Sequence, residues 1–229
     1  MTPCRAARRC VIVASAKIPQ QHANRVHEFA ETYVPEDAVL AAARAQAREV
    51  GLTPVGSAAG AALRFIAAAS NARAVVEVGT GTGVSGAWLL RGMRPDGVLT
   101  TIDIEGEHQR VARRAFAEAG YASSRTRIIT GRALDVLPRL ADGAYDLVFL
   151  DHDANEYGPA ADAAARLLRP GGVLAIGAAL AGGRVAGPAQ RDPETVALRT
   201  VVKALRDADD WIPVMLPTND GLLCATKRP

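Results

Sequence analysis

The chain has 229 residues, of which 49% are hydrophobic and 4% aromatic, and its formal net charge is +3. This length suits one α/β domain and leaves too little chain for two full domains. The small excess of basic residues is scattered through predicted helices, which indicates a solvated surface rather than a nucleic-acid groove. No segment of the sequence approaches the roughly 20 apolar residues of a membrane span. We therefore expect neither a membrane nor a nucleic acid as a partner.

Residues 1–20 lack hydrophobic periodicity, and we predict a flexible tail there, followed by a single domain at residues 21–229. A short apolar run at residues 10–16 follows basic residues and imitates a secretion signal, but about seven residues is the lower limit for such a signal. The three cysteines have neither the spacing of metal ligands nor the even number of a disulfide framework. These features predict a cytoplasmic protein.

The first elements of the predicted domain are helices. Two are predicted between Asn24 and Gly51, the second of them opened by Pro35 with acidic residues in its first turn. A third helix, rich in Ala and Gly, is predicted over residues 57–69. Its small side chains require close packing against a neighbour.

From Ala74 onward, short apolar strands alternate with helices. The predicted strands cover residues 74–78, 98–103, 127–130, 145–150 and 172–176. The predicted helices include 105–119, a short one that ends at 140, and one from about 159 to 168. Alternation at this spacing implies parallel β-α-β crossovers and a doubly wound sheet.

The last stretch of the chain breaks this alternation. After a helix at 193–207, two strands at 211–216 and 222–226 are joined by a short connection that contains Asp220-Gly221, a hairpin signal. The sequence therefore predicts an α/β fold with a mostly parallel seven-stranded sheet that ends in an antiparallel pair.

A glycine-rich turn follows the first strand, where Gly79, Gly81 and Gly83 alternate and Glu77 lies two residues ahead. Glycines let the backbone approach a ligand closely. The string that begins at Gly81 also matches a dinucleotide fingerprint, but that fingerprint begins directly after its strand. Glu77 would repel a pyrophosphate, whereas a carboxylate suits the cationic half of S-adenosylmethionine. We therefore expect S-adenosylmethionine, with an NAD-dependent oxidoreductase as an alternative.

The second strand ends in Asp103, 24 positions after Gly79. A carboxylate at this place can accept hydrogen bonds from the two hydroxyl groups of a ribose. The alternative is a cap for the helix that begins near Glu105. Asp103 alone does not separate a methyl donor from NAD, since both contain ribose.

The fourth strand is followed by Asp151, His152 and Asp153. Ligands of doubly wound sheets lie outside the carboxyl ends of the strands, so this tripeptide is expected at the site. Its side chains could bind a metal, act as a base, or hold the adenine and amino groups of a cofactor. Simple loop polarity is the alternative for Asp151, and packing beside adenine is the alternative to catalysis for His152.

Several motifs in this order resemble the catechol and caffeoyl-CoA type O-methyltransferase family, in particular its actinobacterial members. The resemblance extends from about Val34 to the C-terminus. It is carried by residues 75–85, 101–104, 149–153, 166–172 and 183–185. It implies the fold of class I S-adenosylmethionine-dependent methyltransferases, S-adenosylhomocysteine as a product, and a homodimer.

The resemblance also implies the residues that contact the cofactor. On the methionine side these are the turn residues and their neighbours, with the Ser85 hydroxyl on the methionine carboxylate: Val55, Glu77, Gly79, Thr80, Gly81 and Ser85. On the adenosine side, Asp103 matches the ribose carboxylate, while Ile104 and Ala133 match contacts of the adenine. Asp153 matches a further cofactor contact, and Asp151 a carboxylate beside the cofactor and the substrate that is also a metal ligand.

Two departures from the family pattern fall on the acceptor side. The family completes its divalent-cation site with Asp-Asn at the end of the fifth strand, where this chain has Gly177-Ala178. One carboxylate is a poor coordination sphere for Mg²⁺. The family also has a Lys that acts as a base after the Asp-x-Asp segment, and Ala154 is found there instead. We therefore predict no metal-ligand residues in this chain.

The function expected from these observations is an S-adenosylmethionine-dependent O-methyltransferase that acts on a hydroxylated small molecule without a tightly held divalent metal. Asp151 and His152 are the candidate catalytic groups, because a base must remove the proton of the hydroxyl. A protein that binds S-adenosylmethionine but has lost catalysis is the main alternative. A tRNA-modifying methyltransferase is a further one.

Overall fold

The computed structural model describes residues 20–218 and 220–229. Residues 1–19, and with them almost all of the predicted tail, lie outside the described residues. Gln20 already begins a helix, so the predicted tail and the described structure overlap by one residue. The division of the chain at residue 20 stays a prediction.

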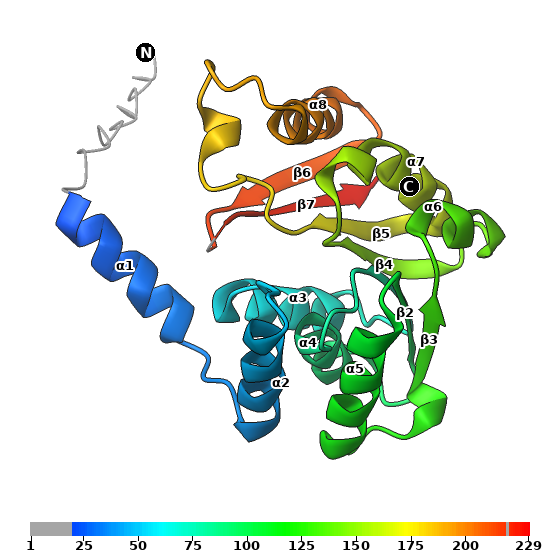
Figure 1. Ribbon diagram of the computed structural model, residues 1–229. Helices are drawn as coiled ribbons and strands as arrows, with labels where there is room; N and C mark the ends of the chain where they lie inside the picture. Colours follow the sequence, from blue (N-terminus) through cyan, green and yellow to red (C-terminus); the bar gives the residue numbers. More distant parts are fainter. Residues whose placement is uncertain (1–19, 219) are drawn as a thin grey trace, which may run out of the picture.

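Three helices precede the sheet: α1 (Gln20–Thr32), α2 (Ala38–Glu49) and α3 (Ser57–Ala69). The start of α2 is fixed by Asp37, whose side chain accepts hydrogen bonds from two backbone N–H groups of the first turn. All three helices were expected from the sequence. In Figure 1, α1 extends away from the rest of the molecule, whereas α2 and α3 lie against it.

One sheet of seven strands organises the molecule. The strands are β1 (Ala74–Val78), β2 (Val98–Asp103), β3 (Thr126–Thr130), β4 (Tyr145–Leu150), β5 (Leu168–Ile176), β6 (Trp211–Leu216) and β7 (Leu222–Lys227). Their order is β3-β2-β1-β4-β5-β7-β6. The first five are parallel, and β7 pairs antiparallel with both β5 and β6. The predicted doubly wound sheet with an antiparallel C-terminal pair is confirmed.

Helices cover both faces of this sheet. The remaining ones are α4 (Val84–Gly92), α5 (Gly106–Glu118), α6 (Ala133–Val136), α7 (Tyr157–Leu167) and α8 (Pro193–Asp207). Short 3-10 turns are η1 (Ser123–Arg125), η2 (Leu137–Arg139), η3 (Ala154–Glu156) and η4 (Arg184–Ala186). Helices α2 to α5 lie on one face and α6 to α8 on the other (Figure 1). Among the described residues, no helix is both long and apolar enough to cross a bilayer.

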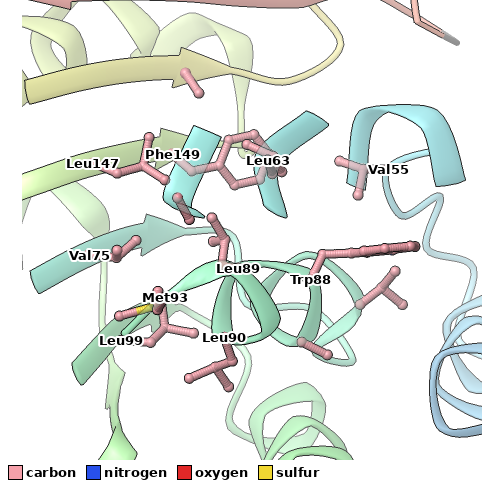
Figure 2. Close-up of a cluster of buried hydrophobic side chains, with 14 of the residues drawn as sticks. Val55, Leu63, Val75, Trp88, Leu89, Leu90, Met93, Leu99, Leu147 and Phe149 are labelled. Carbon is pink, nitrogen blue, oxygen red and sulfur yellow. The ribbon is translucent and has the colours of Figure 1, made fainter. Parts of the chain in front are cut away.

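The two faces have separate hydrophobic cores, because successive strand residues point to opposite sides. Val75 belongs to the core under α2 to α5, and its neighbour Val76 to the core under α7 and α8. Figure 2 shows the first core, where Phe149 of β4 and Leu63 of α3 meet. The indole of Trp88 on α4 extends toward Val55 in the same view. Both cores support the ends of β1 and β4 from the two sides.

Several predicted boundaries were wrong. Helix α1 begins at Gln20 rather than at Asn24, and α2 begins at Ala38 rather than at Pro35, with no acidic residue in its first turn.

The predicted starts of α7 and β5 were wrong as well. Helix α7 begins at Tyr157 rather than at Pro159, because η3 leads directly into it and a proline is tolerated in the first helical turn. Strand β5 begins at Leu168 rather than at Gly172, since Leu168 already pairs with Tyr145 across an irregularity in the register. Both errors come from reading proline and glycine as the ends of elements.

Candidate active site

The glycine-rich turn follows β1, at the point where the order of the strands reverses: β2 lies on one side of β1 and β4 on the other. The Gly79 N–H donates to the Ile102 carbonyl at 2.8 Å, and the Asp151 N–H donates to the Val78 carbonyl at 2.9 Å. Gly79 has φ +97, and a side chain there would collide with the Asp151 carbonyl oxygen. Only glycine therefore allows the ends of β1, β2 and β4 to come this close, at the place where open α/β sheets bind ligands.

Three adjoining pockets follow this edge of the sheet. The β2-side pocket, of about 340 Å³, is lined by residues that include Ile104, Ala133 and His152. The turn pocket, of about 290 Å³, is lined by the glycine turn and by Ser85, and it shares Asp103 and His152 with the first. The β5-side pocket, of about 170 Å³, lies beyond Asp151. The three form one groove across the carboxyl ends of the parallel strands.

Asp103 lies between the first two pockets and holds the turn in place. Its Oδ2 accepts a hydrogen bond from the Gly81 N–H at 2.8 Å, and its Oδ1 accepts one from the Glu105 N–H at 2.9 Å. The bond to Glu105 closes a turn just before α5, whose N-cap residue is Glu105 and whose first N–H groups have no side-chain cap, so the alternative role of Asp103 as a helix cap was wrong. Each carboxylate oxygen has a second lone pair, so these bonds leave room for two ribose hydroxyl donors.

Glu77 does not line any of the three pockets, although it was expected at the cofactor. It is fully buried beneath the turn, where the Thr101 hydroxyl donates to its carboxylate at 2.6 Å. The Thr80 hydroxyl lies 2.7 Å from that of Thr101 and completes a buried polar chain. Burial raises the pKa of Glu77 to about 7, and hydrogen bonds from the Ser85 and Thr101 hydroxyl groups offset part of this rise. The geometry favours a supporting role for Glu77 under the turn.

The start of α4 faces the turn pocket. Gly83 is the N-cap residue and provides no side chain, so the first N–H groups of the helix are not capped by a side chain. Ser85 lies in this first turn and lines the pocket. Uncapped N–H groups and the positive end of the helix dipole favour a carboxylate at this position.

The β2-side pocket has flat, apolar walls. Ile104, which is 63% exposed, forms one wall, and the buried Ala133 forms another. Arg132 and Glu156 also line this pocket, and their side chains form an ion pair at 2.7 Å. The ion pair joins the loop before α6 to η3 beside the pocket.

His152 has a buried imidazole between the two larger pockets. Both ring nitrogens are buried and have no hydrogen-bond partner among the described residues. The ring packs edge-on against Tyr157, with the centroids 5.0 Å apart. Burial lowers the pKa of His152, so the neutral ring is favoured. Unpaired buried nitrogens are uncommon in folded proteins, and this residue lines both of the larger pockets.

Asp151 lines both the turn pocket and the β5-side pocket. Burial raises its pKa to about 7, and the negative charge of Asp220 adds to this effect. Asp153 faces the two larger pockets and also caps η3, because its Oδ1 accepts a hydrogen bond from the Asn155 N–H at 3.0 Å.

The residues beside Asp151 do not fit the divalent-cation site of the resembled family. Gly177 has no side chain, and a Cβ atom added there would lie 2.7 Å from the Asp151 Oδ1, so the Asp151 carboxylate would have to move to admit a ligand side chain at 177. Ala178 follows without an oxygen ligand. Within the described ranges 20–218 and 220–229, no three His, Cys, Asp or Glu side chains form a group that could hold a metal ion.

Several residues that line these pockets were not predicted from the sequence. Thr53 and Pro54 form a wall shared by the turn pocket and the β5-side pocket. Arg44 supports this wall, since it donates to the Val55 carbonyl at 2.8 Å. Val55, expected at the methionine portion of the cofactor, lines the β5-side pocket rather than the β2-side pocket or the turn pocket. No local motif identifies this loop as part of the site. It precedes α3, outside the strand-turn-helix unit, and only the folded structure brings it next to the glycine turn.

Asp220 was also missed as a site residue. The Asp220-Gly221 pair was interpreted as a hairpin signal, and that turn does join β6 to β7. The structure shows in addition that Asp220 and Thr218 line the β5-side pocket opposite Asp151. The pairing of β7 with β5 brings the hairpin to this pocket. The role of Asp220 therefore depends on a contact between distant parts of the sequence, which no local motif indicates.

The strand order and the ligand groove define a class of protein, the methyltransferases with a Rossmann-like fold that use S-adenosylmethionine. A family model described as O-methyltransferase matches residues 31–228. This chain belongs to that O-methyltransferase family.

Relatives and solved structures agree with this assignment. The Mycobacterium tuberculosis (strain H37Rv) protein named "Probable O-methyltransferase Rv1220c" is 50% identical over 198 residues, which cover 86% of this chain and 88% of that protein. A Corynebacterium glutamicum protein of known structure is 34% identical, with a TM-score of 0.84 and coverage of 91% and 98%.

The O-methyltransferase TomG from Streptomyces achromogenes, which is involved in tomaymycin synthesis, was crystallised in complex with S-adenosylmethionine. It is 30% identical to this chain, with a TM-score of 0.81, and the match covers 93% of this chain and 100% of TomG. The chain is thus an O-methyltransferase that depends on S-adenosylmethionine.

Proposed function

We propose that S-adenosylmethionine lies along the groove with its adenine in the β2-side pocket and its methionine portion in the turn pocket. Asp103, between the two pockets, would accept hydrogen bonds from the ribose hydroxyl groups. The uncapped start of α4 and the Ser85 hydroxyl would hold the methionine carboxylate. The His152 imidazole, which lines both pockets and whose buried nitrogens have no hydrogen-bond partner among the described residues, supports this fit.

The adenine contacts in this proposal are apolar walls and short polar groups. Ile104 and Ala133 would enclose the ring, and Asp153 would face its polar edge. Gly79, Thr80 and Gly81 would follow the methionine chain with backbone groups. Glu77 would act beneath the turn through Thr101 rather than by touching the cofactor.

The reaction proposed is transfer of a methyl group to the oxygen of a hydroxylated small molecule. When bound, S-adenosylmethionine supplies an electrophilic methyl group, whose bond to sulfur breaks as the acceptor oxygen bonds to the carbon, with the electron pair left on sulfur. Asp151 lies where the turn pocket meets the β5-side pocket, and it would accept the proton of the acceptor hydroxyl. The neutral His152 imidazole is the second candidate for a catalytic contact.

We propose that this transfer needs no tightly held divalent metal. The single observation that carries this part is the residues beside Asp151: Gly177 and Ala178 at the end of β5 provide no oxygen side chain as a second ligand. Alignment of the acceptor and removal of its proton would then be the protein's contribution to the rate.

Calorimetry with S-adenosylhomocysteine, with Mg²⁺ and with EDTA, tests both parts. We expect binding that is the same under both conditions, and methylation of hydroxylated acceptors that EDTA does not reduce. Activity that is lost in EDTA and restored by Mg²⁺ contradicts the metal-free proposal. Tight binding without turnover of any acceptor would instead favour a protein that has lost catalysis.

We further propose a homodimer that uses α1. Three large apolar residues at this helix are exposed: Val26 by 62%, Phe29 by 68% and Tyr33 by 72%. The Phe29 and Tyr33 rings are tilted neighbours with centroids 5.9 Å apart. Adjacent exposed apolar side chains are typical of protein contacts. Sedimentation analysis of the full chain and of a Phe29→Ser/Tyr33→Ser variant tests this, and an unchanged dimer in the variant excludes α1.

A cytoplasmic location is also proposed. Cys224 is a buried free thiol, which suits a reducing compartment, and burial raises its pKa to about 12. Fractionation of cells that express the full chain tests this proposal.

A further inference from the structure

The β5-side pocket is the place where an acceptor would meet the methyl group. It shares Thr53, Pro54 and Asp151 with the turn pocket, so the two are neighbours along one groove. The inference below rests on the proposed function, because it identifies the acceptor that this pocket would take.

Charge in this pocket is of one sign. Asp151 and Asp220 both line it, and no Lys, Arg or His side chain is found among its described lining residues. Asp220 has no ion pair in the described part of the chain. Two carboxylates beside a partly enclosed cavity attract a positive group strongly, because water screens them less than at an open surface.

The position of Asp220 is fixed by the backbone around it. Its carboxylate accepts a hydrogen bond from the Gly182 N–H, and its carbonyl accepts one from the Leu180 N–H at 2.8 Å. The Ala179 N–H donates to the Gly221 carbonyl at 3.1 Å. The carboxylate is therefore held on the pocket wall by the segment after β5 rather than carried on a free side chain.

The Thr218 hydroxyl is a second, independent sign of a missing ligand. Its oxygen is buried on the wall of the same pocket and has no hydrogen-bond partner in the part of the chain that the structure describes. A hydroxyl can accept a hydrogen bond from an N–H donor, so Thr218 and Asp220 are complementary to the same group.

We propose that the β5-side pocket selects an acceptor that carries a protonated amine, with the ammonium between Asp220 and Thr218 and the reactive hydroxyl toward Asp151. Asp220 is then a specificity-determining residue. The remaining walls, formed by Pro54, Val55 and Ala59, suit the apolar part of such an acceptor.

The test uses three probes that differ mainly in charge: 3-hydroxybenzylamine, 3-hydroxybenzyl alcohol and 3-hydroxybenzoate. Calorimetry of the full chain saturated with S-adenosylhomocysteine should show that the amine binds about tenfold more tightly than the other two. Asp220→Asn keeps an oxygen for the Gly182 N–H but removes the charge, and it should abolish the preference. Asp209→Asn, at an exposed carboxylate between α8 and β6, should keep it.

Equal binding of all three probes, binding of none, or a preference that survives in Asp220→Asn overturns the proposal. So does a requirement for Mg²⁺, since a metal ion would then be the positive group between the carboxylates. If S-adenosylhomocysteine itself does not bind, the proposed function fails, and that result is seen before any probe is added. The unfolding midpoint of each variant shows whether it has kept its fold.

Discussion

The Asp103 carboxylate accepts a hydrogen bond from the Gly81 N–H, and the two atoms are 2.8 Å apart. This bond connects the end of β2 to the glycine turn after β1. The sequence left two roles open for Asp103, a ribose contact and a cap near Glu105. The structure shows that the carboxylate braces the glycine turn through one oxygen and bonds to the Glu105 N–H through the other, without capping α5.

A substitution at Asp103 separates these roles. Asp103→Asn keeps one oxygen acceptor but loses the charge and the second acceptor, so we expect S-adenosylhomocysteine to bind roughly 10- to 100-fold more weakly, as for the loss of a charge-assisted hydrogen bond. Asp103→Ala should weaken binding further and lower the unfolding midpoint, because the brace on Gly81 is lost as well. Calorimetry and thermal unfolding measure the two effects. Asp162→Asn, at an exposed carboxylate of α7, is the control, and unchanged affinity in Asp103→Asn would contradict a ribose contact.

The contact between Gly177 and Asp151 predicts the outcome of an attempt to restore a metal site. Gly177→Asp introduces the family's ligand type, but its Cβ would lie 2.7 Å from the Asp151 Oδ1. The Asp151 carboxylate would have to turn away to admit this side chain, and Ala178 still provides no oxygen ligand, so we expect no gain in Mg²⁺ affinity by calorimetry. Gly187→Asp, whose added Cβ would meet other atoms only at 3.5 Å, is a control with the same new charge. Micromolar Mg²⁺ binding by Gly177→Asp would refute this account.

The sequence predicted the fold well because its signals are local. Strands such as Val98–Asp103 are short apolar runs bounded by turn residues. Helix α8 has Asp192 as its N-cap residue and begins at Pro193. The predicted starts of α7 and β5 were wrong because both elements continue through proline and glycine residues that usually end a helix or a strand.

The sequence predicted residues of the β2-side and turn pockets, because one strand-turn-helix unit carries many of them. The β5-side pocket is assembled from the loop before α3, the end of β5 and the β6–β7 hairpin. Neither the burial of Glu77 nor the proximity of Asp220 to Asp151 follows from a motif. Both depend on which strands are neighbours in the sheet.

We expect the ion pair between Arg132 and Glu156 to slow the release of the cofactor, so that a variant without the pair releases it faster. Both side chains line the β2-side pocket and join two segments at its edge. Arg132→Ala should raise the dissociation rate of S-adenosylhomocysteine a few-fold with little loss of stability, because exposed ion pairs contribute little to stability. Stopped-flow measurements at low and high salt would detect this, and salt should reduce the difference between the two proteins.

Arg110→Ala removes a comparable exposed ion pair, with Glu107 on α5, and is the control for Arg132→Ala. If both variants release the cofactor at the same rate as the wild type, the Arg132–Glu156 pair does not restrain it.

Glu77 predicts a dependence of stability on pH. Its pKa is raised by burial from 4.5 to about 7 in the folded protein, so between these values the folded state holds a proton that the unfolded state has released. The stability that this group contributes is fully present below about pH 4.5 and is lost as the pH rises through 7. One pKa unit corresponds to about 1.4 kcal/mol, so the loss is on the order of 3 kcal/mol for this group.

Glu77→Gln removes the titration and keeps an oxygen for the Thr101 hydroxyl, so its free energy of unfolding should fall less between pH 5 and pH 8 than that of the wild type. Asp151 also has a raised pKa and its charge acts on Glu77, so the difference between the two proteins reports Glu77 together with its interaction with Asp151. Denaturant unfolding at several pH values measures it, with the exposed Glu105→Gln as the control. A fall of equal size in Glu77→Gln and in the wild type would show that the buried carboxylate is not protonated near neutral pH.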